Sequence, residues 1–186
     1  MRLTKLGYYS DFVAYPMVVI ALTVIDFIHL EHQLIGWLSA CAAGVVVWTL
    51  LEYTLHRVAL HRMSLFSPLH ALHHRAPLEF IGTASWVSVP VWCATILVPL
   101  WALLGLNIAT GITIGVMLGY WWYGIVHHII HHRAHEKSGA YFKRLRAWHM
   151  RHHHSPKRGN FGVTTRAWDH VFGTVIDSRQ KTLISS

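Results

Sequence analysis

Four long apolar segments dominate the pattern of hydrophobic and polar positions along this chain. They cover roughly residues 12–30, 34–53, 85–104 and 106–126. An α-helix needs about 20 apolar residues to cross a bilayer, and each segment is close to that length. Only a few residues separate the first segment from the second and the third from the fourth. The pattern therefore predicts an all-α integral membrane protein with about four transmembrane helices in two hairpins.

Two prolines leave an alternative open for the third apolar segment. Pro90 and Pro99 lie inside it, and proline removes a backbone hydrogen bond from a helix interior. A fold with two spans and re-entrant hairpins therefore stays open beside the four-span fold.

Basic residues are confined to the ends of the apolar segments. The 186 residues include 16 Lys and Arg against 8 Asp and Glu, which gives a net charge of +8. All 16 basic residues lie in residues 2–5, 57–75 or 133–181. This distribution follows the positive-inside rule rather than the even spread expected of a nucleic-acid-binding protein. We therefore expect one multi-pass membrane domain, 1–186, with both termini and a histidine-rich helical cap in the cytosol, and no nucleic-acid partner.

An amphipathic pattern follows the fourth apolar segment. Tyr141, Phe142, Leu145 and Trp148 recur at helical spacing among basic residues. The pattern is typical of a helix that lies in the membrane interface, and it fits equally a basic helix packed on the cytosolic cap.

Histidine is unusually frequent, with 17 residues, and most of them lie in four clusters. Each cluster lies where an apolar segment ends or in the polar stretch after it, so folding the hairpins together gathers the clusters just outside the bilayer. Residues three and four apart share one face of a helix, so each cluster presents several imidazoles together. The clusters are His56 and His61; His70, His73 and His74; His127, His131 and His132; and His149, His152 and His153.

Eleven imidazoles around one site require cations between them, because desolvated imidazoles without a metal are costly. One metal ion takes four to six ligands, so this number favours two metals. Imidazole binds iron, zinc, copper and nickel, which leaves the metal open. The chain lacks the H-E-x-x-H string of zinc metalloproteases. A non-catalytic metal-binding or metal-transport membrane protein is the alternative of a different class, although the spans are poor in ligand residues.

The order of these motifs resembles the fatty acid hydroxylase/sterol desaturase superfamily of membrane di-iron oxygenases. The resemblance covers about 56–174 and rests on HRVALH, HALHH, HMRHH, the segment GYWWYGIVHHIIHH and the tail NFGVTTRAWDHVFGT. It implies O2-dependent hydroxylation of a lipid C–H bond, in a fatty-acyl, sterol or related lipid, with desaturation as the alternative. It also implies two iron ions, which zinc can replace during purification, held by His56, His61, His70, His73, His74, His127, His131, His132, His149, His152 and His153. His132 fits least well, because it lies about 140° around the helix from His127.

Several other residues are candidates for supporting roles. Asp169 and Glu52 could each accept a hydrogen bond from a ligand imidazole, and Asp169 fits equally a helix N-terminal position or an ion pair with Arg166. Four aromatic residues are candidates for a lipid channel, although Trp and Tyr are also common at membrane interfaces. These are Trp86, Trp121, Trp122 and Tyr123.

Electrons for such a reaction need a donor. Many relatives carry a fused cytochrome b5 domain and this sequence has none, so the resemblance implies a separate donor of the ferredoxin or cytochrome b5 type. Basic residues such as Lys143, Arg144 and Lys157 could dock an acidic carrier or hold anionic lipid headgroups. The sequence leaves the substrate, the position of attack, the donor and the oligomeric state open.

Overall fold

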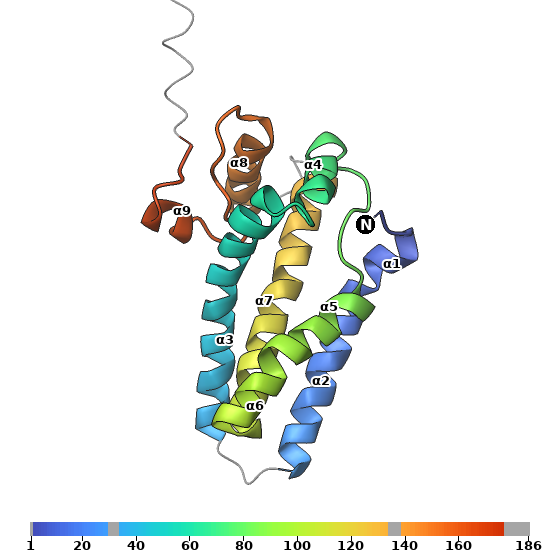
Figure 1. Ribbon diagram of the computed structural model, residues 1–186, viewed down its shortest axis with the longest axis vertical. Helices are drawn as coiled ribbons and strands as arrows, with labels where there is room; N and C mark the ends of the chain where they lie inside the picture. The colour runs from blue at the N-terminus through green and yellow to red at the C-terminus, as the bar shows by residue number, and fades with distance from the viewer. Residues whose placement is uncertain (1, 30–33, 134–138, 177–186) are drawn as a thin grey trace, which may run out of the picture.

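The computed structural model describes residues 2–29, 34–133 and 139–176, and this part of the chain is mainly helical. Figure 1 shows a bundle of long helices with a cap of shorter helices at one end. The helices in chain order are α1 (Lys5–Tyr9), α2 (Asp11–His29), α3 (Leu34–Thr54), the π-helix η1 (Leu55–Leu60), α4 (Ser67–Arg75), α5 (Ser85–Trp92), the π-helix η2 (Cys93–Leu97), α6 (Val98–Leu104), α7 (Leu106–His132), α8 (Ala140–His154) and α9 (Ala167–Val171).

Four helical stretches are long and apolar enough to cross a membrane, which confirms the sequence prediction. They are Lys5–Ile28, Leu34–Leu60, Ser85–Leu104 and Leu106–His132. The third stretch runs as one continuous helical path through α5, η2 and α6. Pro90 has no backbone N–H to donate, and the wider turns of η2 begin three residues after it. Pro99 lies in the first turn of α6. The third segment therefore forms one continuous helical stretch that is long enough to cross a membrane, as the four-span prediction requires.

Glycines bring the two hairpins into close contact along α3 and α7. Gly111, Gly115 and Gly119 are spaced four apart on α7, and Gly44 faces them from α3. A Cβ atom at Gly115 would clash with the carbonyl oxygen of Cys41, and one at Gly119 would clash with the Trp48 ring. Small residues at this spacing let helix backbones approach in a membrane, where packing rather than the hydrophobic effect holds helices together.

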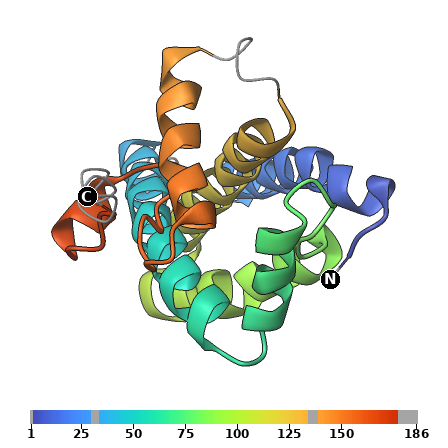
Figure 2. The same ribbon diagram turned by 90° about the horizontal axis from the view of Figure 1, so that it is seen from above.

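The cap covers the end of the bundle at which α7 finishes. Seen from above, α4 and α8 lie over this end on different sides of it (Figure 2). Val126 and Ile130 of α7 form a buried cluster with Leu145 of α8 and Val163 of the following loop. Because Leu145 and Trp148 are buried, α8 packs on the cap with its apolar face, the second of the two alternatives for this helix.

Candidate metal centre

A π-helical turn aligns the first two histidines. η1 carries His56, and His61 follows directly after it. In an α-helix, residues five apart point about 140° away from each other, whereas the i→i+5 bonding of a π-helix places them nearly one above the other. The two imidazoles accordingly stack with ring centroids 5.2 Å apart. The H-x4-H spacing, which an α-helix would separate, thus becomes a ligand pair.

Five imidazoles from η1, α4 and α8 converge with their Nε2 atoms facing inward. Four of them form a closed ring of Nε2–Nε2 distances: 3.0 Å from His70 to His61, 3.1 Å from His61 to His152, 3.1 Å from His152 to His74 and 3.0 Å from His74 to His70. The Nε2 of His56 lies 3.0 Å from that of His70. We call His56, His61, His70, His74 and His152 the five-histidine group.

These distances fit a metal ion better than hydrogen bonds. The Nε2 of His70 approaches three other Nε2 atoms at 3.0 Å, those of His56, His61 and His74, but a neutral imidazole carries one ring proton. With metal–nitrogen bonds of about 2.1 Å, ligands at right angles lie about 3.0 Å apart, whereas tetrahedral ligands lie about 3.4 Å apart. Five of the ten Nε2–Nε2 distances are thus close to the spacing of ligands at right angles around one ion, and the group could hold a metal ion through its five nitrogens.

Backbone carbonyls fix the orientation of two of these rings. The Nδ1 of His56 donates to the Phe161 carbonyl at 2.6 Å, and the Nδ1 of His152 donates to the Gly159 carbonyl at 2.8 Å. A proton on Nδ1 leaves the Nε2 lone pair free to face the centre of the group, as in most metal-bound histidines. The loop after α8 thus selects the tautomer that binds metal.

A second group of imidazoles lies beside the first. His73, His127, His131 and His149 form the four-histidine group. The Nε2 atoms of His149 and His131 are 3.0 Å apart, and His153 adds its own Nε2 at 3.0 Å from that of His149. The Nε2 of His73 is buried and has no hydrogen-bond partner within residues 2–29, 34–133 and 139–176, as expected of a ligand atom.

The two groups share a boundary. The rings of His74 and His153 stack with centroids 4.1 Å apart, and those of His70 and His73 lie 5.8 Å apart. Two metal ions held by these groups would be neighbours, as a dinuclear centre requires.

Burial lowers the pKa values of His61, His73 and His152 and keeps these imidazoles neutral near neutral pH. Desolvation lowers the pKa of His61 and of His73 to about 4, with smaller contributions from His74 to both, from Arg158 to His61 and from His132 to His73. Desolvation lowers the pKa of His152 to about 3. A neutral imidazole has the lone pair that a metal needs, so this environment favours metal over protons near neutral pH.

The structure brings together ten of the eleven predicted ligands and leaves out His132. The His132 ring stacks on His128 with centroids 4.6 Å apart and on Phe80 at 5.9 Å. The Tyr8 hydroxyl lies 3.2 Å from the Nδ1 of His128. His128 and His132 lie on a different face of α7 from His127 and His131, because successive helix residues are about 100° apart. His132 therefore belongs to an aromatic cluster with α1 and not to either metal group.

The two carboxylates proposed to orient imidazoles hold the backbone of the loop instead. Asp169 is fully buried and accepts hydrogen bonds from the backbone N–H groups of Phe161 and Gly162 at 2.8 and 2.9 Å. Glu52 accepts from the backbone N–H groups of Val163 and Thr164 at 2.7 and 2.9 Å. The expected direct contact with a ligand imidazole is thus corrected: among the described residues, these carboxylates act on His56 and His152 through the loop carbonyls.

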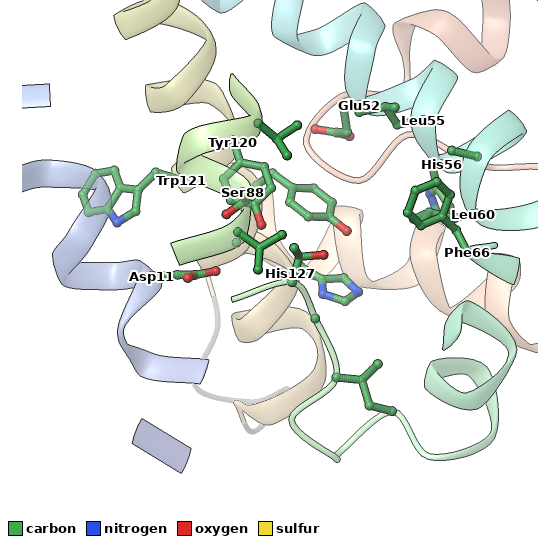
Figure 3. Close-up of a pocket in the computed structure, with 18 of the residues that line it drawn as sticks. Asp11, Glu52, Leu55, His56, Leu60, Phe66, Ser88, Tyr120, Trp121 and His127 are labelled. Atoms are coloured by element: carbon green, nitrogen blue, oxygen red, sulfur yellow. The ribbon is translucent and has the colours of Figure 1, made fainter. Parts of the chain in front are cut away.

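A largely apolar cavity of about 430 Å³ adjoins the histidines. His56, His70, His73 and His127 form part of its wall, and the rest comes mainly from the spans (Figure 3). Its volume falls in the range of pockets that bury small organic ligands. The arrangement can therefore bring an apolar chain next to a metal pair while excluding water.

Two of the four channel candidates line the cavity. Trp121 and Tyr123 do so, and Tyr123 stacks on His127 with centroids 5.5 Å apart. Trp86 and Trp122 do not, and their side chains are 64% and 41% exposed on the outside of the bundle. Trp122 points toward α8 instead, where its ring lies 6.4 Å from that of Phe142. The sequence analysis missed Tyr15, Ser88 and Tyr120, which line it as well and come from three helices.

Comparison with known proteins points to one family. The sequence model of the fatty acid hydroxylase family matches residues 41–174. The chain is 37% identical over 145 residues to dihydroceramide fatty acyl 2-hydroxylase FAH2 of Arabidopsis thaliana, covering 72% of this chain and 59% of that protein. It is 31% identical over 146 residues to human fatty acid 2-hydroxylase, covering 71% of this chain and 38% of that protein.

A solved structure agrees with this assignment. The structure described as full-length scs7p, in which only the hydroxylase domain is visible, superposes with a TM-score of 0.78 at 29% identity. The match covers 92% of this chain and 67% of the other. The chain spans less than two thirds of the length of the curated relatives named above. The matched region contains all ten clustered histidines and the loop that orients them, so the chain belongs to the fatty acid hydroxylase family.

Proposed function

We propose that this protein hydroxylates a C–H bond in the acyl chain of a membrane lipid, using O2 and two electrons at a pair of iron ions. The overall reaction converts R–H, O2, two electrons and two protons into R–OH and water. The observation that carries the proposal is the position of the two histidine groups at the end of an apolar cavity within the bundle. The relatives described above are a fatty acyl 2-hydroxylase and a fatty acid 2-hydroxylase, which supports hydroxylation over desaturation.

Iron fits the donor set. The ligands would be neutral imidazoles, which suit iron, and the five-histidine group would offer five nitrogens to one ion. When bound, the metal pair supplies the activation of O2 that amino-acid side chains cannot provide. Zinc would occupy the same nitrogens without redox chemistry, so the purified protein must be tested for both metals.

The chain itself positions the substrate and excludes water. An acyl chain in the cavity would lie against Trp48, Trp121 and Tyr123, with one carbon next to His56 and His127. The Tyr123 ring holds the His127 ring in place by stacking. Burying the chain in this cavity removes its apolar surface from water and limits which carbon reaches the metals.

The distribution of basic residues indicates how the protein is oriented in the membrane. Placing the cap, with its basic residues, in the cytosol satisfies the positive-inside rule. Electrons would then come from a cytosolic carrier of the ferredoxin or cytochrome b5 type. Lys143 and Arg144 near the start of α8 and Arg158 in the following loop give this side a positive charge that an acidic carrier would recognise.

Metal analysis and lipid mass spectrometry test the proposal together. Wild-type protein is expressed with a reducing system in a host grown with 18O2, and its lipids are compared with those of the His70→Ala variant. The matched control is His154→Ala, which removes a cap histidine that lies in neither group. We expect about two irons per chain and a lipid that gains one 18O atom with the wild type and with the control only. A lipid that loses two hydrogens would indicate desaturation, and unchanged lipids in an iron-loaded, reduced protein would contradict both.

A further inference from the structure

Two arginines lie over the Trp148 ring on the side of the cap where α9 lies beside α8 (Figure 1). The guanidinium carbons of Arg151 and Arg166 are each 5.3 Å from the centroid of this ring. Trp148 is only 4% exposed, whereas Arg166, which precedes α9, is exposed and Arg151 is half-buried. We call Arg151 and Arg166 the arginine pair. The pair thus presents positive charge directly above a buried aromatic ring.

In the described part of the chain, neither member of the arginine pair forms an ion pair with a carboxylate. The nearby Asp169 is fully buried, and both of its oxygens accept hydrogen bonds from Trp148 and from the loop after α8. The positive charge of the pair is therefore available to an anionic partner. Guanidinium groups suit carboxylates, which they bind through two parallel hydrogen bonds.

Short routes of bonds connect Trp148 to both histidine groups. Trp148 directly precedes His149 of the four-histidine group in the chain. Its Nε1 donates to Asp169 at 3.2 Å, and Asp169 accepts from the Phe161 N–H at 2.8 Å. The Phe161 carbonyl in turn accepts from the Nδ1 of His56, in the five-histidine group, at 2.6 Å. One ring therefore reaches one group through the backbone and the other through three hydrogen bonds.

The proposed reaction needs such a route, because it consumes two electrons at buried metals. Electronic coupling falls steeply with distance, and it falls less steeply through bonds and hydrogen bonds than through gaps. The arginine pair marks a place where a partner can dock, and Trp148 lies between that place and the ligands His149 and His56. A lipid headgroup would also bind the guanidinium groups, but it would have no use for the routes beneath them.

We propose that the arginine pair is the docking point of an acidic one-electron carrier protein, and that Trp148 bridges electron transfer from this carrier to the metal pair. The inference rests on the proposed function, which supplies the need for electrons. In each docking event the carrier loses one electron and one metal ion gains it, so two events supply the two electrons of the reaction. Trp148 stays neutral and unreduced throughout. Contacts between exposed charges speed association and allow the spent carrier to leave, as repeated delivery requires.

Carrier binding tests the docking point without turnover. The protein in phosphatidylcholine nanodiscs is titrated at low salt with the soluble haem domain of a cytochrome b5, and the anisotropy of a label on this acidic carrier gives the Kd. Arg166→Glu should raise the Kd about tenfold, and the difference should shrink at high salt. The matched control is Arg62→Glu, which makes the same charge change on an exposed residue after η1 and should leave the Kd nearly unchanged.

The same variant separates a carrier from a lipid headgroup. Wild-type protein and Arg166→Glu are purified from one host, and the anionic lipid that each retains is measured. Equal carrier Kd values for the two proteins would overturn the inference. A loss of anionic lipid in the variant at an equal Kd would in addition assign the arginine pair to headgroups.

Electron transfer from the bound carrier tests the bridge. Reduced carrier at saturating concentration is mixed with oxidised, iron-loaded protein in the absence of O2 and lipid, and stopped-flow absorbance follows the reoxidation of its haem. Trp148→Phe keeps an aromatic ring but removes the Nε1 donor, so reoxidation per bound iron should become several-fold slower at an unchanged Kd. Trp37→Phe, near the start of α3, is the matched control and should keep the wild-type rate.

The outcomes separate this inference from the proposed function. An unchanged rate per bound iron in Trp148→Phe would overturn the bridge. Reoxidation that depends on Trp148 and Arg166 without any lipid product would refute the proposed function alone. Lipid hydroxylation with carrier binding and reoxidation unaffected by both variants would overturn the inference alone.

Discussion

Replacing Asp169 by Asn should remove one metal by disturbing the loop that orients its ligands. Asp169 Oδ1 accepts from the Phe161 N–H at 2.8 Å and the Thr174 hydroxyl at 2.7 Å, and Oδ2 accepts from the Gly162 N–H at 2.9 Å and from Trp148 Nε1 at 3.2 Å. Either orientation of the Asn amide points its NH2 group at a backbone N–H. The substitution therefore breaks hydrogen bonds to the loop, although the Asn side chain has the same shape as that of Asp.

The magnitude follows from the number of bonds lost. A hydrogen bond to a charged group contributes about 1.5–3 kcal/mol, so losing two of four costs about 3 kcal/mol or more. The Phe161 and Gly159 carbonyls hold the Nδ1 atoms of His56 and His152. Removing such support weakens metal binding about 10- to 100-fold. We expect the five-histidine group to lose its metal first and the four-histidine group to keep its own.

A chelator titration followed by metal analysis measures this effect. Wild-type protein should retain about two metals per chain over a range of chelator in which Asp169→Asn retains about one. Asp26→Asn is the matched control, because Asp26 is also buried and accepts from Thr110 and Asn107 at 3.0 and 3.1 Å, far from the cap. The control should lower the melting temperature without changing metal retention. Identical retention curves for Asp169→Asn and the wild type would refute the reasoning.

Three further results are expected. His74→Ala should lower the metal content by about half, because His74 completes the ring of the five-histidine group. His132→Ala should leave the metal content unchanged, because His132 lies outside both groups. Equal losses of metal in the two variants would contradict the grouping. The metal-free protein should lose stability as the pH falls from about 6.5 to about 4. The unfolded chain takes up protons at an ordinary His pKa of 6.5, whereas in the folded protein the pKa values of His61 and His73 are lowered to about 4. A melting temperature that rises on acidification would refute this prediction. Gly115→Val should prevent the close approach of α3 and α7, so detergent-solubilised protein should aggregate in size-exclusion chromatography, whereas Gly139→Val, where nothing lies within 4 Å, should remain monodisperse.

Most of the clustered histidines could be predicted from their spacing along the chain. On α4 and α8, residues three and four apart share a face whatever surrounds the helix, so His70, His73 and His74 could be grouped from the sequence. The same rule applied to His131 and His132 fails, because adjacent residues diverge by about 100°. The contact of His132 with His128, four residues earlier on α7, follows from helix periodicity, whereas its contact with Phe80 appears only in the tertiary structure.

Long-range contacts explain what the sequence analysis missed. The bond between Glu52 and the Val163 N–H joins residues 111 positions apart, and the one between Tyr15 and Ser88 joins residues 73 positions apart. No local pattern marks such pairs. The positions of Glu52, Asp169 and the cavity-lining Tyr15 and Ser88 therefore depend on how the hairpins and the cap come together.

The sequence by itself determined the four apolar segments and indicated most of the histidines that the structure brings together. The length of a span follows from bilayer thickness, and the spacing of ligands follows from helix periodicity, so both can be recognised in the sequence alone. Only the tertiary structure decided how the histidines divide into two groups, which loop carbonyls orient His56 and His152, and which residues line the cavity. These features arise from hydrogen bonds and packing between helices that are distant in the chain, and their geometry exists only once the two hairpins have closed.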